Sequence, residues 1–189
     1  MKSIESKNSS QINNWSNFLL LISFLAFLLL SYLIYQRYNP QKLAFDMPEI
    51  NAAENLKISE QRPVGLKINS IDLSLPIILS EIKNNQWQAT TEGVSLLKTS
   101  AVPGEVGNSV IYGHNWPNLL GNLKRVQPGD KLIVIFSDNS SKEFEVEYKV
   151  EVDPEETSIL ENSNDHRLTI YTCSGFLDSK RVVIVAKLI

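Results

Sequence analysis

The sequence predicts an all-β domain, a closed or nearly closed β-barrel with short helices, preceded by one N-terminal transmembrane helix. Three observations predict this class. About seven or eight short alternating or β-branched runs are separated by turn residues. The segment that holds them shows no long amphipathic helix and no repeat of about 20 to 50 residues. One mostly apolar stretch near the N-terminus carries no charged residue. A β-sandwich is the alternative architecture.

Composition and charge limit the domain organisation and the kinds of partner that the protein can have. The 189 residues, 43% hydrophobic and 21% charged, suit one compact domain with an appendage. A net charge of -3, from 18 basic and 21 acidic residues, gives no basic excess, so nucleic acid is not an expected partner. A single cysteine makes no internal disulfide, so the fold must depend on packing.

The apolar stretch divides the chain into segments. Phe18 to Tyr35 carries no charged residue, and at about 1.5 Å per residue a helix of this length nearly spans a bilayer. A cleaved signal peptide is the alternative, but the run is longer than a usual signal core and no A-x-A-like site follows. The prediction is a polar tail over 1–14, a membrane helix over 15–36, a spacer over 37–55 and the domain over 56–189. The basic residues on the two sides of the helix are nearly equal in number, so charge alone does not decide its orientation; the tail is cytoplasmic if the domain acts at the cell surface.

The first half of the domain alternates in short runs. Pro63 to Ile71 reads as a strand and Asp72 to Ile78 turns into a second, with Pro76 suited to an edge or a strand start. Asn84-Asn85 marks a turn. The segment from Trp87 to Ser100 is mixed, with a short helix or a loop expected around Gly93. Ser109 to Tyr112 is a short apolar strand that ends at Gly113-His114.

The second half is more regular. Leu119 to Val126 predicts one or two helical turns, and Lys131 to Phe136 predicts a strand buried on both faces. A cleanly alternating strand follows and completes a hairpin. Asp153-Pro154 predicts the start of a short helix that runs through Leu160. The residues expected to point inward from the alternating strand are Phe144, Val146, Tyr148, Val150 and Val152.

The last hairpin of the chain carries two of the three candidate catalytic residues. Its strands, Leu168 to Cys173 and Arg181 to Leu188, flank a Ser/Gly/Asp connection, so Cys173 and Arg181 are expected at facing strand ends. A thiol beside the small Ser174-Gly175 pair can attack an acyl carbon. His114, at another strand end, is a candidate proton partner. A guanidinium that stays protonated can bind an oxyanion.

Structural readings compete with these functional ones. Free cysteine is often a buried small hydrophobe, a histidine often caps a loop, and Arg181 is alternatively an exposed strand residue. His166 lies in a polar loop and is expected at the solvated surface. The chain has no C-x-x-C, H-E-x-x-H or Gly-rich phosphate loop, so neither a metal nor a cofactor is expected. The acidic residues Glu143, Glu145, Glu147 and Glu151 indicate a solvated strand face rather than a calcium site.

Three motifs in order resemble the sortases, cysteine transpeptidases of bacterial surfaces. They are G-N-S-V-I-Y-G-H-N at 107–115, L-T-I-Y-T-C at 168–173 and R-V-V-I-V-A at 181–186. The T-L-x-T-C signature of the sortases is matched by Thr169 to Cys173, with isoleucine in place of leucine. The resemblance covers roughly Leu56 to the C-terminus, and the membrane helix before the domain also agrees with it.

The resemblance implies an eight-stranded barrel in which Cys173, His114 and Arg181 converge, with Thr172 and Ser174 as substrate-binding residues. It implies cleavage of an LPxTG-like sorting signal on surface proteins through a thioester, and transfer to an amine of a cell-wall peptide or a pilin lysine. The helix would anchor the enzyme in membrane lipid by a single pass, with the domain outside the cytoplasm. The connection from Cys173 to Arg181 is short, so the long loop of some sortase classes is absent. The alternatives are a cysteine endopeptidase without transfer and a non-catalytic barrel that binds surface proteins.

Overall fold

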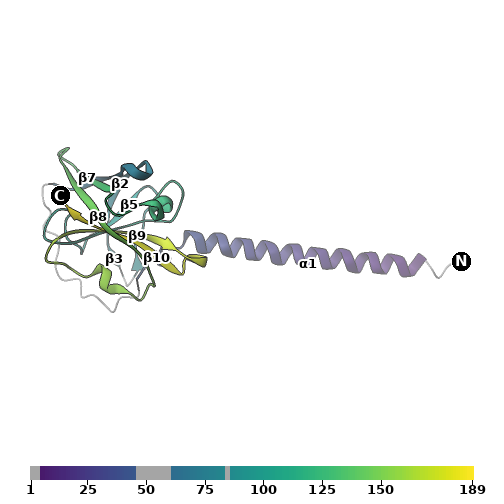
Figure 1. Cartoon of the computed structure of the whole chain (residues 1–189). Coiled ribbons are helices and arrows are strands. Elements are labelled where there is room, and N and C mark those ends of the chain that lie inside the picture. Colours follow the sequence, from purple (N-terminus) through teal and green to yellow (C-terminus); the bar gives the residue numbers. More distant parts are fainter. Residues whose placement is uncertain (1–4, 46–60, 84–85) are drawn as a thin grey trace. The chain divides into compact units, whose positions relative to one another are not determined.

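The structure is a computed structural model that describes residues 5–45, 61–83 and 86–189. The chain divides into two units, Met1–Asn39 and Pro40–Ile189 (Figure 1). The first consists of helix α1 (Glu5–Tyr38), which therefore begins within the predicted polar tail. Its apolar stretch Trp15–Gln36 has 22 residues, or about 33 Å of helix, which is long enough to cross a membrane by length and composition.

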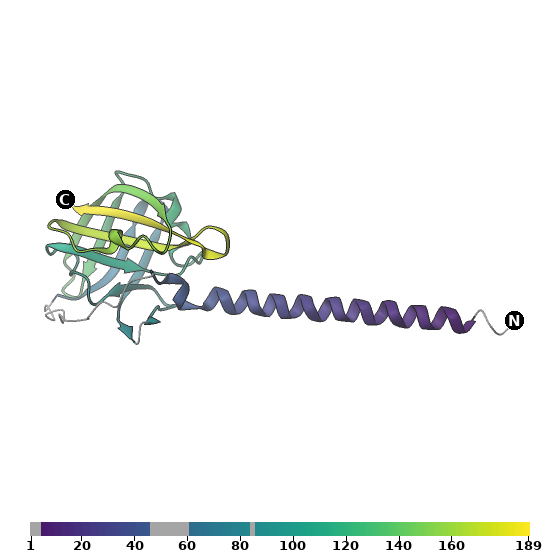
Figure 2. The same ribbon diagram turned by 90° about the horizontal axis from the view of Figure 1, so that it is seen from below.

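The second unit is a closed eight-stranded barrel, as predicted, and the sandwich alternative is wrong (Figure 2). The strand order is β1-β2-β5-β6-β9-β10-β8-β7, with β2–β5 and β6–β9 parallel and the other neighbours antiparallel. The strands are β1 (Pro63–Ile68), β2 (Leu73–Ser80), β5 (Val94–Leu97), β6 (Gly107–Tyr112), β7 (Lys131–Phe136), β8 (Ser141–Val152), β9 (His166–Ser174) and β10 (Lys180–Leu188). Outside the barrel, β3 (Ile82–Lys83) pairs with β4 (Gln86–Trp87). The short 3-10 helices are η1 (Pro40–Leu43), η2 (Asn69–Ile71), η3 (Leu120–Arg125), η4 (Thr157–Leu160) and η5 (Phe176–Asp178).

Two apolar clusters lie on opposite faces of the barrel wall. Strand residues alternate between faces, so strands that are buried throughout must be covered on both sides. β6 is buried along its whole length, and most of β9 and β10 are too. Residues such as Ile111, Ile170 and Ile184 fill the barrel, whereas Tyr112, Tyr171 and Cys173 belong to a second cluster. Cys173 therefore lies on the outer face of the wall.

The side chains predicted to point inward from β8 do so in the first half of the strand but not in the second half. Phe144 and Val146 are buried in the barrel, but Tyr148 is 43% exposed. The register with β10 shifts where Tyr148 and Val146 face Val185 and Ala186, so Glu147 is an extra residue. Such a bulge moves the following side chains to the other face. Val150 and Val152 consequently pack against the outer cluster.

One other local prediction is wrong and two are correct only in part. β7 is not buried on both faces, because its buried side chains alternate with the exposed Lys131 and the half-buried Ile133 and Ile135. The loop predicted around Gly93 is present over residues 88–93, but the strand that follows it, β5, was not predicted. The predicted short helix ends at Leu160 as expected, but it is the 3-10 helix η4 and begins at Thr157 instead of directly after Asp153. The predicted turn at 84–85 lies outside the described residues, whereas the predicted helical turns near Leu120 are confirmed as η3.

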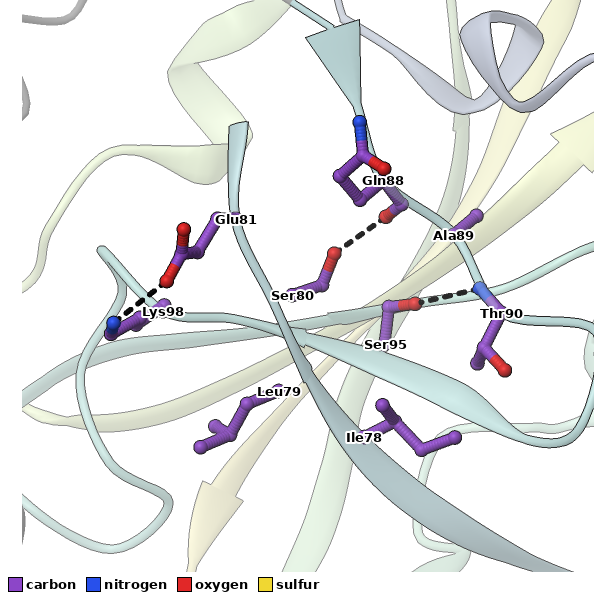
Figure 3. Close-up of a pocket in the computed structure, with 9 residues that line it drawn as sticks. All are labelled: Ile78, Leu79, Ser80, Glu81, Gln88, Ala89, Thr90, Ser95 and Lys98. Atoms are coloured by element: carbon purple, nitrogen blue, oxygen red, sulfur yellow. Dashed lines mark hydrogen bonds and ion pairs between the residues drawn. The ribbon is translucent and has the colours of Figure 1, made fainter. Parts of the chain in front are cut away.

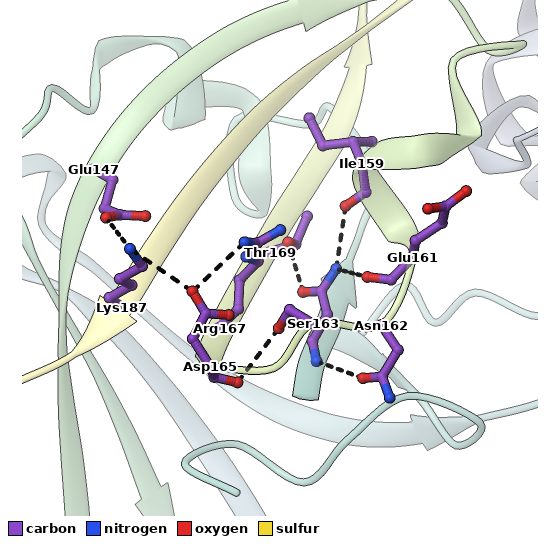
Figure 4. Close-up of polar contacts among 10 residues, drawn as sticks. Glu147, Ile159, Glu161, Asn162, Ser163, Asp165, Arg167, Thr169 and Lys187 are labelled. Atoms are coloured by element: carbon purple, nitrogen blue, oxygen red, sulfur yellow. Dashed lines mark hydrogen bonds and ion pairs between the residues drawn. The ribbon is translucent and has the colours of Figure 1, made fainter. Parts of the chain in front are cut away.

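A buried asparagine, Asn108, fixes the connection between β8 and β9 to the barrel. Figure 4 labels its partners in this connection, Ile159, Glu161 and Asn162. Asn108, 2% exposed on β6, accepts a 2.7 Å hydrogen bond from the hydroxyl of Thr169. Its amide donates to the carbonyls of Ile159 (3.1 Å) and Glu161 (3.0 Å). Its backbone N–H donates to Oδ1 of Asn162 at 3.1 Å. One side chain therefore holds three carbonyl or hydroxyl groups from two different segments.

Asn108→Ala is expected to lower the free energy of unfolding by about 2 kcal/mol, because the deleted amide leaves buried carbonyls unpaired. For a domain of this size the melting temperature should fall by about 4–8 °C. Thermal unfolding of the full chain in detergent measures this. Lys187→Ala is the control, because its ion pairs with Glu147 and Asp165 are exposed at the surface. Equal melting temperatures of the Asn108 variant and the wild type would contradict the proposed anchoring.

Candidate active site at the ends of β6, β9 and β10

Three neighbouring strands bring the predicted catalytic residues to one end of the barrel wall. Cys173 on β9 is directly opposite Arg181 on β10, as the sequence predicted for the hairpin. Tyr112, the last residue of β6, is opposite Tyr171 of β9. His114 comes two residues after Tyr112, and Cys173 comes two residues after Tyr171. Because β6 and β9 run parallel, His114 and Cys173 leave the wall at the same end.

Thr172 joins β9 to the end of β6. Its hydroxyl donates a 2.6 Å hydrogen bond to the carbonyl of Gly113, the residue before His114. Gly113 in turn donates from its N–H to the carbonyl of Tyr171 at 3.4 Å. Thr172, predicted to bind substrate, is 1% exposed and directs its hydroxyl at the backbone. Its observed contact therefore positions the chain that carries His114.

The imidazole of His114 is 6% exposed and stacks on Trp116, with 4.5 Å between ring centroids and 11° between ring planes. This contact fixes the plane of the ring. Ser174, the other predicted substrate-binding residue, has a buried Oγ without a hydrogen-bond partner among the described residues. Gly175 follows with φ of 76°, a left-handed value that glycine adopts without strain, and starts the tight connection to β10.

A short segment before the barrel covers the thiol. We name residues 41–45 the strap; they lie in the predicted spacer, whose remainder from residue 46 is outside the described residues. The thiol of Cys173 donates to the carbonyl of Lys42, with 3.0 Å between Sγ and the oxygen. Leu43 is wholly buried and Phe45 is 2% exposed. The strap is thus part of the packed structure around Cys173.

The strap also contacts the arginine and the loop between β9 and β10. Nη2 of Arg181 donates to the carbonyl of Ala44 at 2.8 Å. The ammonium of Lys42 donates to the carbonyl of Leu177 at 3.1 Å and lies 3.5 Å from the carboxylate of Asp178. These contacts place two carbonyls that are two residues apart, those of Lys42 and Ala44, on the two groups predicted to act on a substrate. Residues 41–43 belong to η1, and the N–H of Ala44 donates to the carbonyl of Gln41 at 3.0 Å, so the strap presents these two carbonyls from the end of a helical turn.

Arg181 is held in place by its own loop. It is 4% exposed, and Nη1 donates to the carbonyls of Asp178 (3.0 Å) and Lys180 (2.9 Å). Its guanidinium carbon lies 5.9 Å from the centroid of the Phe45 ring. Nε is buried without a partner among the described residues. The guanidinium is therefore pre-oriented and keeps one donor for an additional acceptor.

Burial controls the protonation of the site. It raises the pKa of the Cys173 thiol to about 12, an effect that the charge of Arg181 partly opposes and that of Asp178 reinforces. Burial also lowers the pKa of His114, against the opposing influence of Asp178. At neutral pH the covered site consequently holds a thiol and a neutral imidazole. A thiol, a base that can accept its proton and a fixed cation together suit acyl transfer.

His166 does not belong to this site. It begins β9, so about 23 Å of strand separates it from Cys173. Its side chain is exposed, and Nδ1 lies 3.0 Å from the carbonyl of Gly104. The prediction that it lies at the surface is confirmed. Within the described part of the chain, no group of three or more His, Cys, Asp or Glu side chains is arranged to hold a metal ion.

A separate pocket of about 450 Å³ lies between β2, β5 and the segment after β4 (Figure 3). Its polar groups are paired with one another. Ser80 donates to the carbonyl of Gln88 at 2.6 Å, and Lys98 lies 2.7 Å from Glu81. None of the predicted catalytic residues lines it. The pocket is therefore separate from the end of β6, β9 and β10, where those residues lie.

The sequence did not reveal the strap, Tyr171 or Asp178 as parts of the site. The alternation of Leu43 and Phe45 within an otherwise polar spacer was the available signal for the strap. Tyr171 precedes Cys173 by two residues, which places both side chains on one face. Asp178 gave no separate signal, because short loops commonly carry aspartate.

Comparison with known proteins agrees with this geometry. Sortase A of Bacillus anthracis is 27% identical over 149 residues, which cover 76% of this chain and 68% of that protein. Sortase A of Listeria monocytogenes is 27% identical over 128 residues, so the match spans only 55% of that relative's length. The solved Listeria structure has a TM-score of 0.54 at 26% identity and covers 67% of this chain and 87% of that one.

A lid mutant of sortase A from Corynebacterium diphtheriae shares the fold, with a TM-score of 0.59 at 24% identity; the match covers 84% of this chain and 92% of that one. The family model described as the sortase domain matches residues 66–189. This range contains the barrel from Leu66 onward and all three predicted catalytic residues. The chain belongs to the sortase family.

Proposed function

We propose that this sortase-type enzyme is a cysteine transpeptidase that cleaves an LPxTG-like sorting signal and transfers the new carboxyl end to an amine. The observation that carries the proposal is the position of the strap. Its backbone carbonyls accept hydrogen bonds from the thiol of Cys173 (3.0 Å) and the guanidinium of Arg181 (2.8 Å), so both groups can bind main-chain carbonyls of a peptide segment. A substrate that replaces the strap would present its scissile carbonyl to the same two groups.

The first half-reaction forms a thioester. His114 takes the thiol proton, and the Cys173 thiolate attacks the Thr-Gly carbonyl of the signal. The developing oxyanion is stabilised by the Arg181 guanidinium. When the tetrahedral intermediate collapses, the C–N bond breaks and the imidazolium of His114 gives its proton to the leaving glycine amine. The carboxyl end of the substrate then remains as an acyl group on Sγ.

The second half-reaction restores the enzyme. An amine of a cell-wall peptide or a pilin lysine attacks the thioester while His114 accepts its proton. The thiolate leaves and the proton returns to sulfur, so one amide bond replaces another. Helix α1 anchors the enzyme in membrane lipid by a single pass, with residues 1–14 in the cytoplasm and the barrel, assigned to residues 56–189, at the cell surface.

A peptide assay tests the proposal. The full chain in detergent is mixed with a fluorogenic LPxTG-type peptide, with and without oligoglycine, and the products are identified by mass. The expected result is a transfer product that appears only when the amine is present. The same hydrolysis product in both mixtures would indicate an endopeptidase. No product, together with an unreactive thiol in strap variants, would indicate a non-catalytic barrel.

Arg181→Ala is expected to reduce kcat/KM for the peptide about a hundredfold, the effect typical of losing one oxyanion donor. Steady-state kinetics measures the change. Lys180→Ala is the matched control, because this neighbour directs its ammonium to Asp153 at 3.1 Å on the exposed side of the hairpin. Full activity of the Arg181 variant would contradict its role in stabilising the oxyanion.

A further inference from the structure

The buried face beneath the strap contains a hydroxyl without a partner. Tyr171 is completely buried, and its hydroxyl makes no hydrogen bond with any described residue. The side chain shares a strand face with Cys173, two residues away. Burial raises the pKa of Tyr171 well above its usual value, so the phenol remains a neutral donor. A donor is therefore available beside the nucleophile.

Tyr112 provides a direct comparison. Its ring stacks on Tyr171, with 5.6 Å between centroids and 14° between planes. Its hydroxyl is fully engaged, pairing with Ser80 at 2.9 Å and with the carbonyl of Gln88. Two stacked tyrosines in one cluster thus differ only in whether the protein supplies a partner. Phenylalanine would pack equally well at 171 and would avoid burying an unpaired polar group.

The strap packs against Tyr171 but provides no hydrogen-bond partner for its hydroxyl among the described residues. Phe45 meets the Tyr171 ring edge-on, with 4.9 Å between centroids. The strap therefore contributes an apolar ring at Tyr171, whereas it contributes carbonyl oxygens at Cys173 and Arg181. Nε of Arg181 likewise has no hydrogen-bond partner within the described part of the chain. The strap therefore fills the site without placing a described hydrogen-bond acceptor beside the hydroxyl of Tyr171.

We propose that Tyr171 is a substrate-binding residue whose hydroxyl donates a hydrogen bond to a main-chain carbonyl of the peptide that replaces the strap. The inference rests on the proposed function, because it assumes that a peptide binds over Cys173. A carbonyl near the hydroxyl would remove the unpaired donor that the strap leaves behind. The peptide would then gain a contact that the strap lacks, which favours its exchange for the strap.

Binding measurements test this separately from catalysis. The affinity of a fluorescent LPATG peptide is measured for full-length Cys173→Ala protein, with and without Tyr171→Phe. The expected result is a Kd about tenfold weaker with Tyr171→Phe, the loss typical of one hydrogen bond. The melting temperature should be unchanged or higher, because no internal hydrogen bond is lost.

Tyr112→Phe in the same background is the control. It removes a hydroxyl that the protein itself uses, so it should lower the melting temperature and leave the peptide Kd within about twofold. Equal affinities with and without Tyr171→Phe, or no peptide binding to either protein, would overturn the inference. The proposed function fails on a different observation, the absence of an amine-dependent product with the wild-type enzyme.

Discussion

Cys173→Ala is expected to abolish peptide cleavage and transfer completely, because no other cysteine exists in the chain to form the thioester. The variant should fold normally, since the thiol is a small side chain at the edge of the outer cluster. Mass spectrometry of wild-type enzyme mixed with peptide alone should show an added acyl mass, and the variant should show none. This comparison isolates the covalent step from binding.

His166→Ala is the control for that experiment, because His166 lies at the opposite end of β9 from the nucleophile. It should cleave and transfer at the wild-type rate. Residual cleavage by Cys173→Ala above the peptide's spontaneous hydrolysis would be incompatible with a thioester mechanism. Such a result would return Cys173 to the reading of a buried structural cysteine.

Leu43→Ala is expected to expose the thiol and to raise its alkylation rate about 30-fold. Leu43 is wholly buried in the outer cluster, and shortening a buried leucine removes at least about 2 kcal/mol of packing. If the strap leaves and rebinds as a unit, this loss favours the open form by the same amount. The rate of iodoacetamide labelling of Cys173, measured with enzyme in detergent, follows that population.

The pH dependence of labelling provides a second readout. Alkylation requires the thiolate, and burial under the strap raises the pKa of Cys173 from 9.0 to about 12. In the wild type the labelling rate should therefore continue to rise above pH 9. In Leu43→Ala it should level off near pH 9, because the opened thiol regains water and with it a lower pKa.

Phe176→Ala is the matched control for the strap experiment. Phe176 is 84% exposed on the loop between Cys173 and Arg181, so it lies close to the site in sequence without covering the thiol. Its labelling rate and pH profile should equal those of the wild type. If Leu43→Ala behaves in the same way, the strap does not control access to Cys173.

Local patterns predicted much of the fold, and they were wrong where a tertiary contact changed the pattern. The facing of Cys173 and Arg181 follows from pairing across one hairpin, and it was confirmed. The prediction of which β8 side chains point inward assumed strict alternation along the strand. The bulge at Glu147 interrupts that alternation. The segment after Gly93 has no clear period by itself. It is a strand because β2 and β6 provide partners on both sides.

By itself the sequence determined the apolar helix, the barrel class, the closing hairpin and the three predicted catalytic residues. These depend on composition, on a period of two and on motifs that are contiguous in the chain. Only the tertiary structure decided that Cys173 lies on the outer face of the wall, that residues 41–45 cover it and that the hydroxyl of Tyr171 has no hydrogen-bond partner among the described residues. Those properties require segments more than a hundred residues apart to meet, as Lys42 and Cys173 do with a separation of 131. No local pattern specifies such a contact, because it depends on how the closed barrel places its faces.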